Sequence, residues 1–367
     1  MHALAVVPVG AALVLLTLWD AFETVILPRT VVRLLRLSRT INTVVWRPWA
    51  ALAARARTDG RRERYLSFYG PISVILMLAI WASALLSGFA LIAYGFGSHW
   101  TATPVRPVTF LDDLYGSGTT LFTLGLGDLA PSSSIMRALV VVEAGTGLGF
   151  LTVGIAYLPV LYQSFSRREA QITLLDAWAG SPPAAVEMLR RVAANEAKGE
   201  IQVFLKDWER WCAEMLEAQI SYPQVAYFRS QHGRQSWVSA LTAVLDVSAI
   251  VLAGLDGIPT WQARQTFAIA RHAAVDLSQV LSAAPRRSPR LDATPNDRII
   301  DALEHAGYHV NHGEDARTRL QHLRNMYEPF VAGLSAAFSM ELPPWIHNRA
   351  IKDNWEVTPR AAVEAHL

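Results

Sequence analysis

The pattern with the clearest chemical use is a run of six residues, Thr123-Leu124-Gly125-Leu126-Gly127-Asp128. Glycine takes left-handed backbone dihedrals at little cost, so Gly125 and Gly127 allow several consecutive carbonyl groups to point toward one axis. Ordinary helices and strands do not arrange their carbonyls in this way. Carbonyl oxygens that face one axis can replace the water shell of a cation. The run therefore reads either as a Gly-rich turn between two apolar segments or as a backbone that turns its carbonyl groups toward one axis.

The segments on either side are suited to hold this run in a membrane. Residues 68–96 and 135–165 are each long and apolar enough to cross a bilayer. Between them, residues 109–122 read as a short helix that begins with a capping box from Thr109 to Asp112. The C-terminal end of this helix would point the negative end of its dipole at the cation path.

This arrangement resembles the pore loop of potassium channels, whose filter reads Thr-Val-Gly-Tyr-Gly-Asp. The resemblance covers about residues 68–165, under a third of the chain. It implies a selectivity filter at 123–128 with K⁺ as the permeant ion and no other cofactor. It also implies that Thr123 adds hydroxyls at the inner end, that Leu124 packs against the pore helix, and that Asp128 lies at the outer mouth. A pore needs four such loops, so one loop per chain implies a homotetramer.

Two positions depart from the family pattern. The filter tyrosine of the family is replaced by Leu126, and the aromatic pair of the pore helix falls on Tyr115 and Gly116. Fewer aromatic side chains are therefore expected to support the filter. This makes strict discrimination between potassium and sodium less secure than permeation itself. The side chains expected to support the filter are Tyr115, Thr119 and Glu143, and the Tyr115 side chain would reach Asp128.

Residues 1–27 form a further predicted span, and residues 28–65 carry ten arginines against two acids. Such a loop belongs in the cytoplasm, which places the N-terminus outside. Arg33, Arg36 and Arg39 recur at every third residue, as in the voltage-sensing helix of gated channels. Only one span precedes them, so a cationic helix lying on the inner leaflet explains the same spacing more simply.

The first span carries two acids near its C-terminal end, Asp20 and Glu23. Acids at the membrane interface cost far less than acids at its centre, so we expect them to pair with Arg29 or Arg33. The span lacks the basic start and the small-residue cleavage site of a signal peptide. We therefore expect it in the mature protein.

The inner helix contains several helix-breaking residues: Gly145, Gly147, Gly149 and Pro159. In the resembling family an inner-helix glycine is the bending point of the gate, and here these residues supply that possibility. Close packing of helices through small residues explains the glycines equally well. Glu143 is the only acid of this span, and we expect it to face protein or water because facing lipid would be expensive.

The composition fits a few spanning helices and a soluble part. The chain has 367 residues, 52% of them hydrophobic, with a mean hydropathy of +0.23. A single cysteine, Cys212, excludes an intramolecular disulfide framework and a cysteine-based metal cluster within one chain. The predicted fold class is an all-α membrane protein with three transmembrane helices, a re-entrant pore helix and a helical cytoplasmic domain.

Residues 166–367 form this cytoplasmic domain, which we expect to assemble or gate the pore. An amphipathic helix at 201–216 places five large residues on one face: Phe204, Leu205, Trp208, Trp211 and Met215. Residues 237–255 approach spanning length, but Asp246 at their centre favours a core helix. Residues 285–290 read as a linker. We find no resemblance of this domain to a known family, including the nucleotide-binding domains fused to many potassium channels.

Other sites in this domain have weaker signals. His305, His309 and His312 could hold a divalent ion, although Gly307 interrupts the helical turn between the first two. Residues 227–232 form a polar and aromatic run that reads as a ligand pocket or a packed corner. Catalytic motifs at informative spacing are absent from the sequence, so we expect no enzyme and no nucleic-acid partner.

The sequence thus predicts a potassium channel of the inner or plasma membrane, regulated by an unknown cytoplasmic ligand. Its predicted parts are 1–27, 28–65, 66–165 and 166–367. Two alternatives stay open. One is a weakly selective cation channel, and the other is a non-conducting membrane-anchored sensor or scaffold.

Overall fold

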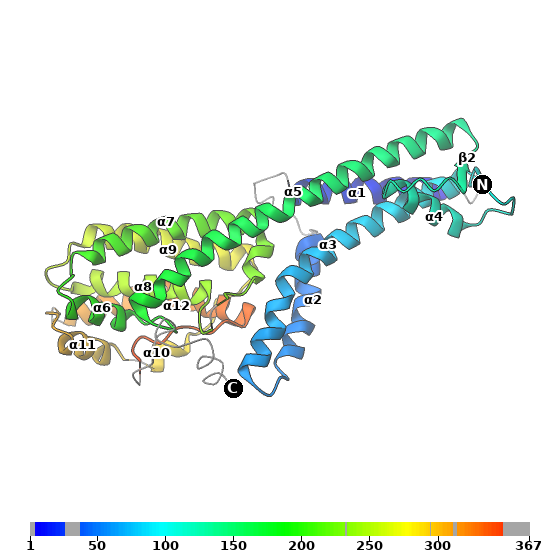
Figure 1. Cartoon of the computed structure of the whole chain (residues 1–367). Helices are drawn as coiled ribbons and strands as arrows, with labels where there is room; N and C mark the ends of the chain where they lie inside the picture. The colour runs from blue at the N-terminus through cyan, green and yellow to red at the C-terminus, as the bar shows by residue number, and fades with distance from the viewer. Residues whose placement is uncertain (1–3, 26–36, 232, 294, 311–313, 348–367) are drawn as a thin grey trace. The chain divides into compact units, whose positions relative to one another are not determined.

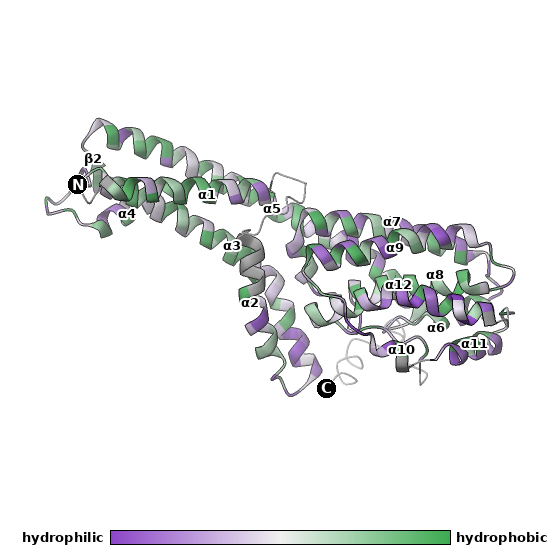
Figure 2. Cartoon of the chain, turned by 180° about the vertical axis from the view of Figure 1, so that it is seen from behind, coloured by the Kyte–Doolittle hydropathy of each residue, from purple (hydrophilic) through white to green (hydrophobic). Residues whose placement is uncertain are grey.

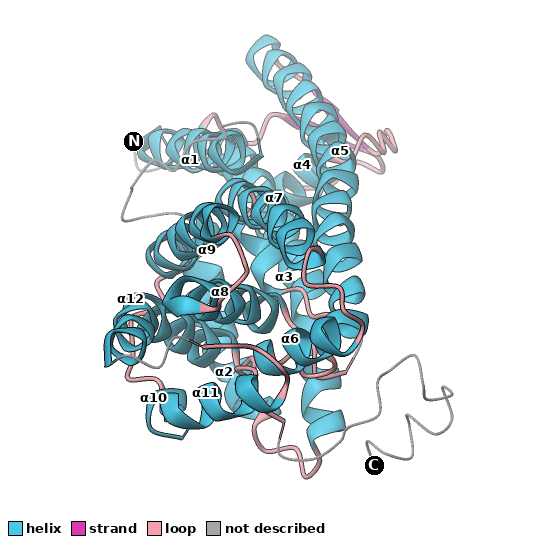
Figure 3. Ribbon diagram, turned by 90° about the vertical axis from the view of Figure 1, so that its left-hand side faces the viewer, coloured by secondary structure: helices cyan, strands magenta, loops and turns pink. Residues whose placement is uncertain are grey.

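The computed structural model describes residues 4–25, 37–231, 233–293, 295–310 and 314–347 (Figure 1). The chain divides into two compact units. The first contains residues 1–46 and 71–162, and the second contains residues 47–70 and 163–367. Helices dominate both units, and the strands in the described residues form one short pair (Figure 3).

Three long apolar helices contribute to the first unit. They are α1 (Val7–Val25), which follows a 3-10 turn η1 (Leu4–Val6), part of α3 (Asp59–Gly95) and part of α5 (Ser134–Ala179). Each is long and apolar enough to cross a membrane. Figure 2 shows apolar residues along all three. The unit also contains the short helix α4 (Phe110–Leu121) and the antiparallel strands β1 (Trp100–Ala102) and β2 (Leu129–Pro131).

Helix α1 packs closely on α3 through two glycines. A Cβ atom added to Gly10 would lie 2.6 Å from the carbonyl oxygen of Gly88, so neither position has room for a larger side chain. Farther along, the Trp81 indole donates to the Asp20 carboxylate at 2.8 Å. The structure thus gives Asp20 an indole partner that the sequence had not indicated. Arg29 and Arg33, the expected partners of the two acids, lie outside the described residues.

Two of the helices are longer than the predicted spans. Helix α3 begins at Asp59 rather than 68, and α5 ends at Ala179 rather than 165. Residues 166–179 contain no glycine or proline, so nothing in them stops the helix before Gly180, which has a φ of +77°. Hydropathy marks the apolar part of a helix, whereas backbone-breaking residues mark its end. Both α3 and α5 therefore contribute residues to both units.

The arginine-rich segment contains α2 (Leu37–Ala53), which lies partly in each unit. The Trp49 indole donates to the carbonyl of Tyr65 at 2.9 Å, and its ring lies 6.0 Å from that of Tyr69. Trp49 thus packs against α3. Arg33 and Arg36 lie outside the described residues, so the voltage-sensor comparison stays an expectation.

The second unit is a helical bundle. Its elements after α5 are α6 (Ala185–Ala194), α7 (Glu200–Ser221), the 3-10 turn η2 (Pro223–Tyr227), α8 (Trp237–Gly254), α9 (Thr260–Val280), α10 (Pro289–Ala293), α11 (Asn296–His305) and α12 (Glu314–Phe338). Helix α9 packs against α7, α8 and α12. The five large residues expected on one face of α7 are all buried, which confirms that prediction. Helix α8 has spanning length, but most of it is buried inside this bundle, as expected for a core helix.

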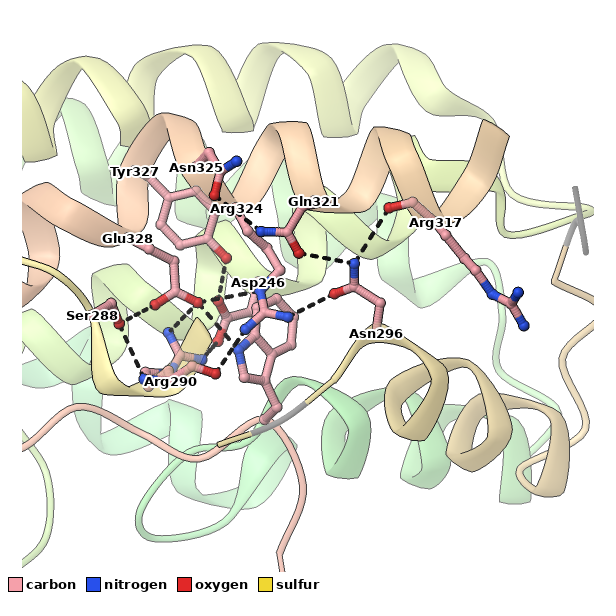
Figure 4. A network of polar contacts seen from close by, with 11 residues as sticks. Asp246, Ser288, Arg290, Asn296, Arg317, Gln321, Arg324, Asn325, Tyr327 and Glu328 are labelled. Carbon is pink, nitrogen blue, oxygen red and sulfur yellow. Dashed lines mark hydrogen bonds and ion pairs between the residues drawn. The ribbon is translucent and has the colours of Figure 1, made fainter. Parts of the chain in front are cut away.

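A buried polar network accommodates Asp246 at the centre of α8 (Figure 4). Its carboxylate accepts hydrogen bonds from Arg290 and from the Tyr327 hydroxyl. Glu328 completes the charge balance, with Arg324 Nε at 3.4 Å. Predicted as part of a linker, Arg290 is instead a buried member of this network, because it neutralises an acid that the apolar helix could not otherwise bury.

Candidate functional site

The backbone of residues 123–127 alternates in handedness. Thr123, Gly125 and Gly127 have φ values of +59°, +56° and +81°, whereas Leu124 and Leu126 lie outside the left-handed region. In a regular strand successive carbonyls point to opposite sides. Alternating handedness instead turns successive carbonyls toward the same side. The two glycines permit this at little cost, whereas the β-branched Thr123 needs its surroundings to hold it there.

The C-terminal end of α4 provides these surroundings. The carbonyl oxygen of Thr119 accepts hydrogen bonds from the backbone N–H of Leu124 at 2.7 Å and of Gly125 at 3.3 Å. The N–H of Thr123 donates to Thr120 at 3.0 Å. The last turn of the helix therefore fixes the start of the run through main-chain bonds, which do not depend on the side chains present.

The start of α4 is fixed as the sequence predicted. Thr109 is its N-cap residue, and its backbone N–H donates to the Asp112 carboxylate at 2.8 Å in a capping box. Arg106 also donates to this carboxylate, at 3.0 Å through Nη1. Both ends of the short helix are thus held in place.

The other end of the run is held by two interactions. The carboxylate of Asp128 hydrogen-bonds with the hydroxyl of Tyr115, as the sequence analysis expected. Its carbonyl accepts the backbone N–H of Thr103 at 2.9 Å. Strand β2 follows directly and pairs with β1, so the loop between α3 and α4 braces this end of the run.

Trp100 on β1 is a supporting residue that sequence reasoning missed. Its ring lies over Gly116, where an added Cβ atom would be only 2.7 Å from the indole Cζ2. Its Nε1 donates to Asp113 at 2.9 Å, and the Ser98 hydroxyl donates to the same carboxylate at 2.6 Å. The glycine at the family's aromatic position therefore leaves room for an aromatic ring from another segment. A tryptophan in the loop before the short helix was the available signal.

Glu143 lies behind α4, on α5, and is only 2% exposed. Its carboxyl group forms a hydrogen bond with the Ser117 hydroxyl. The same hydroxyl oxygen lies 2.9 Å from the carbonyl oxygen of Leu86. The expectation that Glu143 faces protein agrees with this contact, which joins α3, α4 and α5.

The glycines of α5 differ from one another. A Cβ atom added to Gly147 would lie 2.0 Å from the carbonyl oxygen of Leu121, so this glycine permits a close approach to the end of α4. Added Cβ atoms at Gly145 and Gly149 would meet nothing within 4 Å. Helix α5 continues without interruption through all three and through Pro159. Gly147 is therefore a packing glycine, and a bend at the other positions stays a prediction.

The run and the adjoining face of α5 are exposed on the isolated chain. Leu124 and Leu126 are 61% and 64% exposed. Apolar residues of α5 are similarly exposed, among them Val141, Val142, Leu148 and Ile155. An apolar surface of this extent requires lipid or another protein surface to cover it.

The predicted histidine site is not assembled in the described part of the chain. Helix α11 ends at His305, and Gly307 with a φ of +87° turns the chain away, so His309 is not one helical turn further on. Nδ1 of His305 lies 2.6 Å from the carbonyl oxygen of Asp301. His312 lies outside the described residues, and those that are described contain no group of three potential metal ligands.

Comparison with known proteins points to the same part of the chain. Residues 68–163 match the model of a family described as "Ion channel". A stretch of 104 residues is 35% identical to "Uncharacterized membrane protein YdjJ" of Bacillus subtilis (strain 168). This match covers 28% of the chain and 30% of that relative. No solved structure matches. The match to the ion-channel family model thus covers residues 68–163, most of which lie in the first unit, and together with the long apolar helices and the membrane-protein relative it indicates a multi-pass membrane protein.

Proposed function

Because residues 68–163 form an ion-channel family domain, we propose that the protein is a homotetrameric, potassium-selective channel. The observation that carries this proposal is the alternating handedness at Thr123, Gly125 and Gly127. With their carbonyls on one side, residues 123–127 can coordinate a cation that has lost its water. The hydrogen bonds of the run to α4 and of Asp128 to Tyr115 and Thr103 support an arrangement that is held before an ion arrives, as selective coordination requires.

We propose a tetramer because a single chain cannot form a closed ion path. One run of carbonyls forms one side of a path, and a closed path in this family needs four of them. The exposed Leu124 and Leu126 and the exposed face of α5 are surfaces that neighbouring copies would cover. Lipid would cover the remaining apolar surface of α1, α3 and α5.

The charge distribution supports an orientation in the inner or plasma membrane. Ten arginines follow the first span, which favours a cytoplasmic location for residues 28–65 and an external N-terminus. With three spans, this orientation favours a cytoplasmic location for the second unit. We propose that this unit assembles or gates the pore in response to a cytoplasmic ligand.

A weakly selective cation channel is the second candidate, and Leu126 favours it. A leucine cannot supply the hydroxyl by which the family tyrosine is tied to its surroundings. The contact of Trp100 with Gly116 opposes this candidate, because it gives the filter an aromatic support.

The decisive experiment is the reversal potential of purified protein in a lipid bilayer, with potassium on one side and sodium on the other. We expect a value near the potassium equilibrium potential, block by external barium and loss of current in Gly125→Asp. Gly199→Asp, in the second unit, is the matched control and should conduct. A reversal potential near zero would favour the weakly selective pore and make Leu126→Tyr the next variant. Absence of current under varied voltage, pH and divalent ions would favour the non-conducting scaffold.

A further inference from the structure

The second unit contains a short stretch, formed by the last three residues of η2 and the two residues that follow, in which neighbouring residues contact different helices. We call residues 225–229 the corner segment. The sequence left the overlapping run 227–232 open as a ligand pocket or a packed corner. In the structure, residues 225–227 are buried, and the corner segment contacts three parts of the unit: residues 165–168 of α5, residues 69–70 of α3 and the C-terminal end of α12.

The contact with α5 depends on one buried arginine. Arg168 is 4% exposed and donates to the carbonyls of Val225 at 2.9 Å and Phe228 at 2.8 Å. It also pairs with Glu169 at 2.8 Å. Phe165, one turn earlier, places its ring 5.5 Å from that of Phe228. A buried guanidinium cannot lose its carbonyl partners cheaply, so α5 and the corner segment are held together strongly.

The contact with α3 is made by close packing. An added Cβ atom at Gly70 would lie 2.9 Å from the ring of Phe228. The rings of Tyr69 and Tyr227 are 5.2 Å apart. Adjacent side chains of the corner segment therefore rest on adjacent residues of α3.

The contact with the C-terminal end of α12 is made by Arg229 and by the residues just before it. Arg229 donates to the carbonyls of Phe338 at 2.7 Å and Ser339 at 3.2 Å, immediately at the end of α12. The Tyr227 ring packs on Phe338 with centroids 4.9 Å apart. The Trp237 indole of α8 donates to the Ala226 carbonyl at 3.0 Å. The end of α12 is thus connected to α3 and α5 through the same few residues.

We infer that the corner segment is the joint through which the C-terminal helices set the positions of α3 and α5 in the second unit, and thereby gate the pore. This inference rests on the proposed channel function. Helices α3 and α5 are the two helices that flank the candidate filter in sequence, and both continue into the second unit. A shift at the end of α12 must move the corner segment or break its buried bonds. The positions of both helices then change together.

Two variants test the joint by different means. Arg168→Gln combined with Glu169→Gln removes the bonds to the corner segment without leaving a buried carboxylate unpaired. Gly70→Ala keeps every bond and inserts a methyl group between α3 and Phe228. We expect each to change the open probability in bilayers at least tenfold, while single-channel conductance and reversal potential stay as in the unmodified protein, because the candidate filter belongs to the first unit.

Matched controls separate this role from a general loss of stability. Arg167→Gln removes an exposed positive charge next to Arg168, and Gly199→Ala adds a methyl group where nothing lies within 4 Å. Both controls should gate as the unmodified protein does. Assembled test variants that gate like the controls would overturn the inference.

A second measurement keeps the inference testable if the protein carries no current. Burial raises the pKa of the Cys212 thiol, so the native cysteine reacts poorly with labels. Spin labels at the exposed positions Arg64→Cys on α3 and Ser166→Cys on α5, in subunits diluted with unlabelled ones, report the separation of the two helices. The distance distribution should shift or broaden in the double Gln variant and in Gly70→Ala. An unchanged distribution in both would contradict the joint, whereas absence of current alone would contradict only the channel.

Discussion

At the scale of single residues, the contacts of the Ser117 hydroxyl bear on whether the Glu143 carboxyl group is protonated. A hydroxyl group donates one hydrogen bond, yet the Ser117 oxygen lies within hydrogen-bonding distance of both the Leu86 carbonyl and the Glu143 carboxyl. The carbonyl can only accept. If Ser117 donates to Leu86, the bond with Glu143 requires a proton on the carboxyl group. A neutral carboxyl also suits a side chain buried among apolar helices.

This assignment predicts a difference between two substitutions. Glu143→Gln supplies an N–H donor in place of the carboxyl proton and should preserve assembly and current. Glu143→Val removes the partner of a buried hydroxyl and should destabilise the assembled protein by about 1–3 kcal/mol. Thermal unfolding of the assembly together with bilayer current measures both.

Thr146→Val serves as the control for this pair, because the hydroxyl of the half-buried Thr146 donates to the Val142 carbonyl of its own helix. It should resemble the unmodified protein. Equal losses of stability in the Gln and Val variants would contradict the protonated state of Glu143.

The residues that sequence analysis could identify are those whose chemistry is local. Gly125 and Gly127 can take left-handed conformations because glycine has no Cβ atom, and the positions of glycines can be read directly from the sequence. The same conformation at Thr123 depends on its bonds to α4. The role of Trp100 depends on a contact with Gly116, sixteen positions later in the chain, and no periodic pattern encodes such a contact.

At the scale of elements, the loop between α3 and α4 acts as a brace rather than a simple connection. Strand β1 pairs with β2 directly after the candidate filter, and its tryptophan lies against the short helix. One segment thus restrains both the Asp128 end of the candidate filter and the short helix α4. Selectivity should depend on this brace, because a filter that can widen no longer discriminates by ion size or coordination.

Trp100→Leu should therefore retain current but lose discrimination. We expect the reversal potential under potassium and sodium to move toward zero, and a permeability ratio lowered by about tenfold if the contact contributes about 1.4 kcal/mol to selectivity. Trp261→Leu is the matched control, because Trp261 is 70% exposed in the second unit. Refilling the space in the double variant Trp100→Leu with Gly116→Phe should restore part of the discrimination. An unchanged reversal potential in Trp100→Leu would show that the brace does not set selectivity.

The elements themselves were predictable to different degrees. Apolar runs located α1, α3 and α5, because length and hydropathy are sufficient to identify a helix that can span a membrane. Their ends were not located, since the polar extensions of α3 and α5 are stabilised by packing in the second unit. The strands β1 and β2 contain three residues each, too few for any alternation to be recognised.

At the scale of the whole molecule, the two units bury polar groups by different means. The first unit uses small groups of neutral donors around a carboxylate, such as the Ser98 hydroxyl and the Trp100 indole with Asp113. The second unit uses a network in which two arginines and two acids balance their charges around the ring of Trp345, with both guanidinium groups 4.9 Å from the ring centroid. In the sequence, Asp246 favoured a core helix over a spanning one. Sequence analysis could not identify the partners, which lie more than forty positions away.

The placement of Asp246 also bears on how the chain is made. During synthesis α8 emerges before α9 and α12, the helices that later bury it, and at that moment it is an apolar segment of spanning length. The insertion machinery can insert such a segment into the membrane as a further transmembrane helix. An aspartate at the centre of the segment raises its free energy of insertion by about 2.5–3.5 kcal/mol. The acid that the mature fold must neutralise therefore protects the topology of the nascent chain. Asp246→Leu should send a C-terminal reporter to the opposite side of the membrane in a measurable fraction of molecules, whereas Ser248→Leu, which keeps the aspartate, should not.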